Sequence, residues 1–201
     1  MIRQSIAFAA AITIAAPVFA TATVGQPAPD FIAADADGKP VKLSSFKGKT
    51  VVLEWNNPGC PFVQKHYESG NMQKTQAAAH GQGVVWLTIN SGAPGKQGHM
   101  TGAEAQAFEK KEKAHATAYL LDPKGVVGKL YDAKTTPQMF VINPAGTLVY
   151  AGAIDDKPTA DVADIAGARN HVLAALADVK AGKPVSVATS KPYGCAVKYA
   201  S

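Results

Sequence analysis

A strand-to-helix junction around Cys60 is the feature of this sequence that most restricts its fold. The apolar run at residues 50–55 predicts a β-strand that is buried on both faces. A Pro-Gly turn ends this strand, and Cys60-Pro61 follows, where proline is favoured as the first residue of a helix. The partial positive charge of a helix start favours the thiolate, which is the reactive form of cysteine. The junction therefore predicts redox chemistry at Cys60, with an inert, packed cysteine as the alternative.

The remaining pattern of apolar runs and turn residues predicts one α/β domain. An Asp-Gly turn joins the first two strands, and an Asn-Pro-Ala-Gly turn joins the last two. A strand–helix–strand unit, a further strand, a short helix, a hairpin and a closing helix predict a central mixed β-sheet flanked by helices on both faces. We expect strands at residues 31–34, 39–43, 50–55, 84–89, 117–121, 138–142 and 147–151, and helices at 61–80, 103–113, 126–131 and 161–180.

The closing helix is predicted from apolar residues that recur at intervals of three, four and seven. After it, residues 185–201 show little periodicity but carry Cys195, the second of two cysteines in the chain. We treat this segment as a C-terminal tail. The apolar positions expected to form one helix face are Val162, Ile165, Val172, Leu176 and Val179.

The N-terminal segment has the form of a secretory signal peptide. Arg3 precedes an apolar run at residues 6–18, and small residues follow it, so cleavage is expected after Ala20 or Ala22. The alternative, a membrane anchor, is disfavoured because the run is short for a bilayer. We expect a signal peptide at residues 1–22, a domain at 23–184, a tail at 185–201, and export to a bacterial periplasm. Two cysteines can pair in that oxidising compartment.

The charge pattern argues against a nucleic-acid partner. The chain has 20 Lys and Arg against 15 Asp and Glu, for a formal net charge of +5, and its lysines are scattered rather than clustered. We expect no membrane partner after signal removal, no cofactor and no metal. The histidines show no metal-binding spacing, and a Cu(I) site built from the two cysteines and a distant histidine is the weaker alternative.

Three segments resemble the alkyl hydroperoxide reductase/thiol-specific antioxidant (redoxin) branch of the thioredoxin superfamily. They are residues 24–31 (VGQPAPDF), 55–60 (WNNPGC) and 135–142 (TTPQMFVI), and the tail at 191–198 (KPYGCAVK) resembles a peroxiredoxin-like subgroup. The resemblance implies a thioredoxin-like fold and a cis peptide bond before Pro137, packed opposite Cys60. It also implies that the backbone of Thr136 is offered to an extended substrate.

The chain departs from that family's patterns at the active site. Thioredoxins carry a second cysteine where this chain has Val63, so no local disulfide is possible. Peroxiredoxins carry a proline and a threonine at the positions of Leu53 and Asn57, and an arginine near the thiol. Beyond the predicted signal, the only arginine is Arg169, in the closing helix. A standard peroxiredoxin site is therefore not expected.

The candidate site residues have different expected roles. Cys60 is expected to be open to a partner, and Cys195 to resolve its mixed disulfide, with a fixed staple or a free thiol as alternatives for Cys195. Lys65 is expected to lower the pKa of Cys60, whereas the side chain of His66 is expected to point away from Cys60. The alternative for Lys65 and His66 is that both line the solvent face. We assign catalysis to Cys60 and Cys195, substrate binding to Pro58, Gly59, Thr136 and Pro137, and support to Trp55, Asn57, Pro61 and Lys65.

Three functions fit these residues. The first is an exported thiol-disulfide oxidoreductase that acts on protein or small-molecule thiols and disulfides. The second is an atypical thiol peroxidase, an antioxidant acting on peroxides through the same thiol. The third is a non-enzymatic binding protein in which Cys60 and Cys195 form a structural disulfide.

Overall fold

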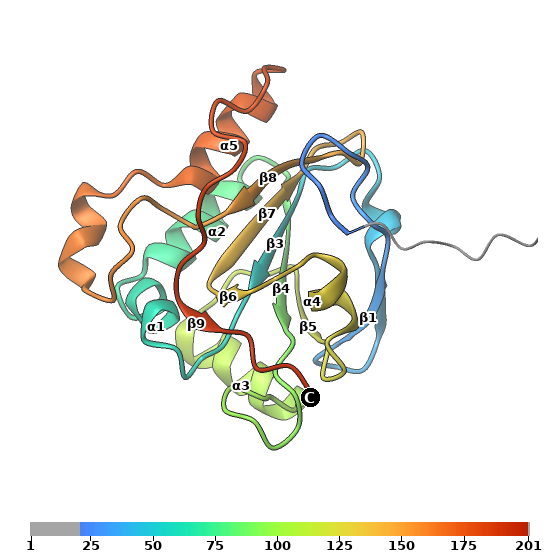
Figure 1. Ribbon diagram of the computed structural model, residues 1–201, viewed down its shortest axis with the longest axis vertical. Helices are drawn as coiled ribbons and strands as arrows, with labels where there is room; N and C mark the ends of the chain where they lie inside the picture. The colour runs from blue at the N-terminus through green and yellow to red at the C-terminus, as the bar shows by residue number, and fades with distance from the viewer. Residues whose placement is uncertain (1–20, 201) are drawn as a thin grey trace, which may run out of the picture.

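A seven-stranded mixed sheet forms the centre of the molecule, in a computed structural model that describes residues 21–200 (Figure 1). The strand order is β2-β1-β5-β4-β3-β7-β8. The central strands β3, β4 and β5 are parallel, and β7 runs antiparallel to β3. The strands are β1 (Ile32–Asp35), β2 (Pro40–Lys42), β3 (Val51–Trp55), β4 (Val85–Asn90), β5 (Ala118–Leu121), β7 (Gln138–Ile142) and β8 (Leu148–Gly152).

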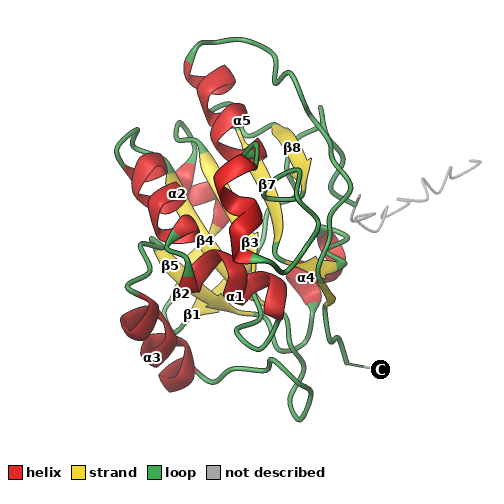
Figure 2. Ribbon diagram, turned by 90° about the vertical axis from the view of Figure 1, so that its left-hand side faces the viewer, coloured by secondary structure: helices red, strands yellow, loops and turns green. Residues whose placement is uncertain are grey.

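Helices cover both faces of this sheet, as predicted. The helices α1 (Pro61–Glu68), α2 (Asn71–His80) and α5 (His171–Lys180) lie in front of the sheet in Figure 2. The helix α4 (Val126–Leu130) and the 3₁₀ turn η1 (Leu43–Phe46) pack into the core on the opposite face. The helix α3 (Gly102–Glu112) packs beside β5.

Alternation along β3 divides the core into two layers. Val52 packs with Trp86 and Val141 in the layer under α1, α2 and α5. Trp55 packs with Phe140 in the other layer. Successive side chains of a strand point to opposite faces, so a largely apolar strand with both faces covered follows from the sequence.

Two predicted helices are wrong in extent. The helix expected at 61–80 is α1 and α2, separated at Gly70, whose φ of +74° is left-handed and cannot continue an α-helix. The helix expected at 161–180 is the 3₁₀ helix η2 (Val162–Gly167) followed by α5, which begins where Asn170 Oδ1 accepts a hydrogen bond from Leu173 N. Val162 is 46% exposed, so the expected continuous apolar face does not form.

The C-terminal tail crosses the molecule as an extended strap. In Figure 1 it runs down from α5 and passes between α1 and β6 (Thr135–Thr136). Its end lies against the loop after β4, where Ala93 N donates to Lys198 O at 2.8 Å. Its strand β9 (Cys195–Ala196) pairs antiparallel with β6. Beyond β9, Val197 N donates to Lys134 O at 2.9 Å. Tail residues therefore complete the region around Cys60.

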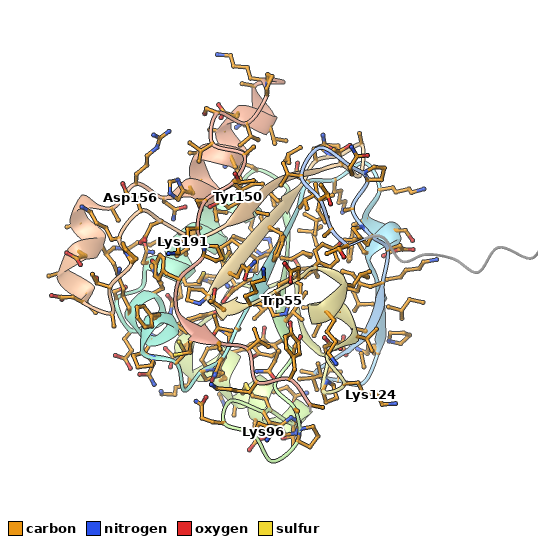
Figure 3. All side chains as sticks on the ribbon, in the orientation of Figure 1. Trp55, Lys96, Lys124, Tyr150, Asp156 and Lys191 are labelled. Atoms are coloured by element: carbon orange, nitrogen blue, oxygen red, sulfur yellow. The ribbon has the colours of Figure 1, made fainter. Side chains whose placement is uncertain are left out.

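The predicted signal peptide, residues 1–22, lies almost wholly outside the described residues. Within residues 21–200, no helix combines the length and the apolar character needed to cross a membrane. The lysines were predicted to be scattered rather than clustered. Figure 3 shows two of them, Lys96 and Lys124, at separate points on the periphery, and both are exposed.

Candidate functional site

Cys60 lies at the start of α1, as the sequence predicts. It is the N-cap residue, and Pro61 is the first helical residue. Strand β7 runs antiparallel to β3 with Trp55 opposite Gln138, so the chain just before Gln138 passes beside the loop that carries Cys60. The Cys60 Sγ accordingly lies 3.1 Å from Thr136 O. The predicted cis peptide bond between Thr136 and Pro137 is confirmed.

The tail brings Cys195 to the same place. In the pairing of β9 with β6, Cys195 is directly opposite Thr136, whose carbonyl oxygen contacts Cys60 Sγ, and Cys195 packs against the buried cluster that contains Cys60. Gly194 permits this approach: a Cβ at this residue would lie 2.0 Å from Thr136 O. Both cysteines are free thiols in the structure. Residues 135 positions apart in the chain thus form one dithiol site.

The expectation that Cys60 is open to a partner is wrong for this conformation. Cys60 is 0% exposed and belongs to a buried cluster with Val63, against which Tyr193 and Cys195 pack. Cys195 is only half-buried. The strap covers the thiol, so a partner reaches Cys60 only when residues 193–195 move.

The two thiols have opposite acid–base behaviour. Burial acts to raise the pKa of Cys60, but hydrogen bonds from the Cys195 thiol and from the backbone N–H groups of Val63 and Cys195 outweigh it and lower the pKa. The pKa of Cys195 rises to about 12, because its thiol is buried and donates to Cys60, whose charge disfavours a second thiolate. Of the two thiols, Cys60 is therefore the more acidic.

Amide side chains hold the loop before Cys60 through hydrogen bonds, and none of these bonds involves the Cys60 sulfur. Asn57 Oδ1 accepts a hydrogen bond from Gly59 N at 3.0 Å, and Asn57 Nδ2 donates to Gln97 Oε1 at 2.9 Å. Pro58 O accepts from Gln64 Nε2 at 3.1 Å. Asn57, Pro58 and Gly59 thus shape the turn that presents Cys60.

Two expected supporting residues lie away from the thiol. Trp55 occupies the opposite core layer, where its Nε1 donates to Ser91 Oγ at 3.1 Å, and Figure 3 shows it in the interior near α4. Lys65 does not act on Cys60; its Nζ donates to Lys157 O at 3.0 Å. The alternative for Lys65 and His66, that both line the solvent face, is also wrong: they are 1% and 0% exposed, and Tyr193 of the strap lies against both.

Sequence reasoning missed Glu54, a buried carboxylate in β3. Trp86 Nε1 donates to Glu54 Oε2 at 2.8 Å, and Tyr67 Oη donates to Glu54 Oε1 at 2.8 Å. Burial raises the pKa of Glu54. A charged residue within an otherwise apolar strand was the available signal. Its further donors are Asn56 Nδ2, Gln76 Nε2 and Thr88 Oγ1.

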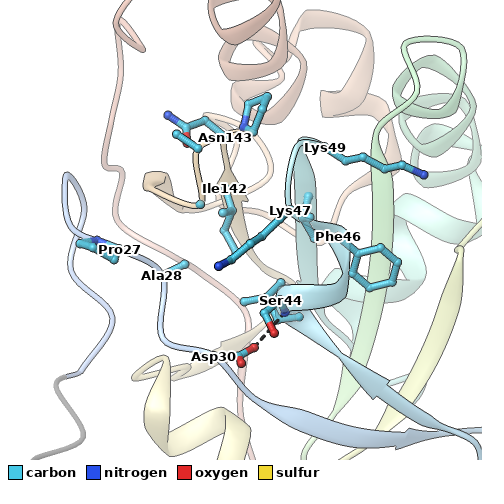
Figure 4. Close-up of a pocket in the computed structure, with 14 residues that line it drawn as sticks. Pro27, Ala28, Asp30, Ser44, Phe46, Lys47, Lys49, Ile142 and Asn143 are labelled. Atoms are coloured by element: carbon cyan, nitrogen blue, oxygen red, sulfur yellow. Dashed lines mark hydrogen bonds between the residues drawn. The ribbon is translucent and has the colours of Figure 1, made fainter.

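No second redox or metal centre is found in the described part of the chain. Within residues 21–200, no group of three or more His, Cys, Asp or Glu side chains is placed to hold a metal ion. A cavity near Asp30, Lys47 and Ile142 lies at the end of the sheet where β3 starts and β7 ends (Figure 4). Cys60 follows the other end of β3, so this cavity is remote from the dithiol site.

Comparison with known proteins agrees with this geometry. Residues 24–151 match the model of the AhpC/TSA family. The chain is 29% identical over 127 residues to the thiol-disulfide oxidoreductase ResA of Bacillus subtilis (strain 168), a match that covers 62% of this chain and 64% of ResA, which is less than two thirds of that relative.

Solved structures show the same architecture. A hypothetical protein from Sinorhizobium meliloti 1021 superposes with a TM-score of 0.73 at 28% identity, covering 90% of this chain and 97% of that one. A Chlorobium tepidum structure assigned as a thiol:disulfide interchange protein DsbE superposes with a TM-score of 0.53 at 26% identity, covering 65% and 85% of the two chains. The fold is thioredoxin-like, and the chain belongs to the AhpC/TSA family.

Proposed function

We propose that this protein is a thiol-disulfide oxidoreductase in which Cys60 is the nucleophile and Cys195 is the resolving thiol. The observation that carries the proposal is the register of β9 on β6, which sets Cys195 opposite Thr136 and against the Cys60 sulfur. A relative named as a thiol-disulfide oxidoreductase and a fold neighbour assigned as a disulfide interchange protein support the same reaction class.

The reaction is two thiol–disulfide exchanges. The Cys60 thiolate attacks one sulfur of a partner disulfide, forms a mixed disulfide and releases the first partner thiolate. The Cys195 sulfur then attacks the Cys60 sulfur, forms the Cys60–Cys195 disulfide and releases the second partner thiolate. Two electrons and the two thiol protons pass to the partner. With a partner dithiol the same steps run in reverse.

The strap imposes an order on these steps. Because Cys60 is covered, residues 193–195 leave before the partner disulfide reaches it. Their return then brings Cys195 to the mixed disulfide. The same segment therefore excludes solvent oxidants at rest and completes the reaction after attack.

The proposal is tested by counting thiols and by equilibrating the mature protein in glutathione buffers, with mass spectrometry after alkylation. We expect a Cys60–Cys195 disulfide that forms and breaks within the glutathione range, and a glutathione adduct on Cys60 that persists in a Cys195→Ser variant. A disulfide that glutathione leaves intact would support the structural staple instead. Absence of any intramolecular disulfide would refute the redox pair.

A thiol peroxidase is the second candidate, favoured by the AhpC/TSA family match. Cys60 would attack a peroxide oxygen, giving a sulfenic acid and an alcohol or water, and Cys195 would condense with it and release water. Arg169, the sole arginine in residues 21–200, is not among the groups that shift the pKa of either thiol, and its backbone N donates to Asp156 Oδ1 at 2.9 Å. Hydrogen peroxide should therefore oxidise Cys60 no faster than a free thiol; a much faster rate would establish the peroxidase.

We also propose export to the periplasm, on the basis of the N-terminal pattern at residues 1–22. The mass and N-terminal sequence of the protein from a periplasmic fraction test this. Cleavage after Ala20 or Ala22 is expected, and an intact Met1 would argue against it.

A further inference from the structure

A buried polar cluster lies beneath the strap, two residues before Cys195. The Tyr193 hydroxyl donates to Asp155 Oδ1 and lies 3.3 Å from His66 Nε2. His66 and Asp155 are 0% and 2% exposed. His66 belongs to α1, and Asp155 to the segment after β8, so Tyr193 joins the strap to two separate parts of the domain.

The hydrogen-bond directions in this cluster depend on one another. Asn71 Nδ2 donates to His66 Nδ1 at 2.8 Å, so neutral His66 carries its proton on Nε2. Nε2–H then donates to the Tyr193 hydroxyl, which in turn donates to Asp155. Burial lowers the pKa of His66 to about 4, which keeps the ring neutral. A hydroxyl group fits between His66 and Asp155 because it can accept one hydrogen bond and donate another.

Asp155 depends on the strap for its hydrogen bonding. Its Oδ1 accepts from Tyr193 and from Lys157 N at 3.0 Å, while its buried Oδ2 has no hydrogen-bond partner and lies 3.9 Å from His66 Nε2. When Tyr193 leaves, a buried carboxylate loses a donor, which is costly. The carboxylate therefore favours the closed strap.

The Tyr193 ring also packs against the first turns of α1. Its centroid lies 5.8 Å from that of Phe62 in an edge-on arrangement, and Lys65 Nζ lies 5.8 Å from it over the ring. Phe62 is the second residue after Cys60. The contacts thus join a residue two positions after Cys60 to a residue two positions before Cys195, and they hold the strap close to both thiols.

We infer that Tyr193, with Asp155 and His66, forms a latch that closes the strap over Cys60 and positions Cys195 for resolution. Tyr193 is a positioning residue, since it acts through Cys195. The effect on access to Cys60 is independent of the reaction, whereas the effect on the disulfide equilibrium rests on the proposed function. Glutathione disulfide oxidises the two thiols to the Cys60–Cys195 disulfide and is itself reduced to two glutathiones.

Tyr193→Phe tests the latch because it removes the hydroxyl and keeps the ring. In a Cys195→Ser background, where Cys60 is the only thiol, we expect iodoacetamide to alkylate Cys60 about tenfold faster. In the otherwise native chain, we expect the equilibrium constant for disulfide formation with glutathione to fall about tenfold, a rise in potential of about 30 mV.

Three further variants separate the latch from general destabilisation. Tyr131→Phe removes a hydroxyl that donates to Pro29 O at 2.8 Å in the opposite core layer, and should change neither quantity. Asp155→Asn keeps an oxygen to accept from Tyr193 and should stay near the native values, whereas Asp155→Ala should behave like Tyr193→Phe.

The outcomes separate the latch from the proposed function. If Tyr193→Phe leaves the alkylation rate unchanged, or if Tyr131→Phe raises it equally, the latch is refuted, even where the disulfide forms normally. If Tyr193→Phe accelerates alkylation and Tyr131→Phe does not, the latch stands. That result holds even if the native chain forms no disulfide with glutathione, in which case the proposed function fails alone.

Discussion

Replacing Gly194 with alanine should open the strap. The residue has a φ of +128°, and an added Cβ would lie 2.0 Å from Thr136 O. The contacted atom is a backbone carbonyl in β6, next to Pro137, and cannot rotate away as a flexible side chain could. The closed arrangement of Cys195 over Cys60 is therefore incompatible with a side chain at residue 194.

The size of the effect follows from this geometry. A non-glycine residue in such a backbone conformation costs about 1–3 kcal/mol before the clash is counted. The chain avoids the cost by opening, so the penalty is limited by the free energy that holds the strap closed. Cys60 should be alkylated at least about tenfold faster. The effective concentration of Cys195 should fall toward the millimolar range of a flexible tether.

The assay is the rate of iodoacetamide alkylation of Cys60 under second-order conditions, read by mass spectrometry of the Cys60 peptide. Gly182→Ala is the matched control, because Gly182 has a φ of +66° but no atom within 4 Å of an added Cβ. It should lower stability by about 1 kcal/mol and leave the alkylation rate unchanged. An unchanged rate in Gly194→Ala would show that the strap does not limit access.

Three other outcomes follow from the buried groups. Cys195→Ala removes a donor to the Cys60 thiolate, so the pKa of Cys60 should rise and the pH profile of its alkylation should move to higher pH. Glu54→Ala leaves buried donors such as Trp86 Nε1 unpaired and should lower the free energy of unfolding by about 3 kcal/mol or more in urea titrations. Since the pKa of His66 is lowered to about 4, the unfolded chain binds its proton first. Stability should therefore fall as pH drops below ~6.5, and NMR titration should show a neutral ring at pH 6.

Much of the fold was predictable because its signals are local. The apolar runs of β3 and β4 predicted strands, and Pro61 marked the start of α1. The break at Gly70 was not predicted, because a single glycine within a helical pattern is a weak signal. The cis bond before Pro137 was predicted from family resemblance rather than from its own residues.

The candidate site was only partly predictable. Cys60 and Cys195 were identified as a pair because the chain has only two cysteines. The burial of Lys65 and His66 was not foreseen, since the residues that cover them include Lys157 and Tyr193, and Tyr193 lies 127 residues beyond His66. Helical spacing shows which way a side chain points, and it does not show what later covers that face.

By itself, the sequence determined which residues are capable of redox chemistry: one thiol at the start of a helix and a second thiol in the tail. It also determined that a β-sheet carries the first of them. Those properties depend on neighbours within a few residues, where local preferences act. Tertiary structure alone decided that β9 pairs with β6, that Tyr193 enters a buried polar cluster, and that Cys60 is covered. They depend on the edge of β6 and on the buried Asp155 carboxylate, which reach these positions only after distant segments have packed together.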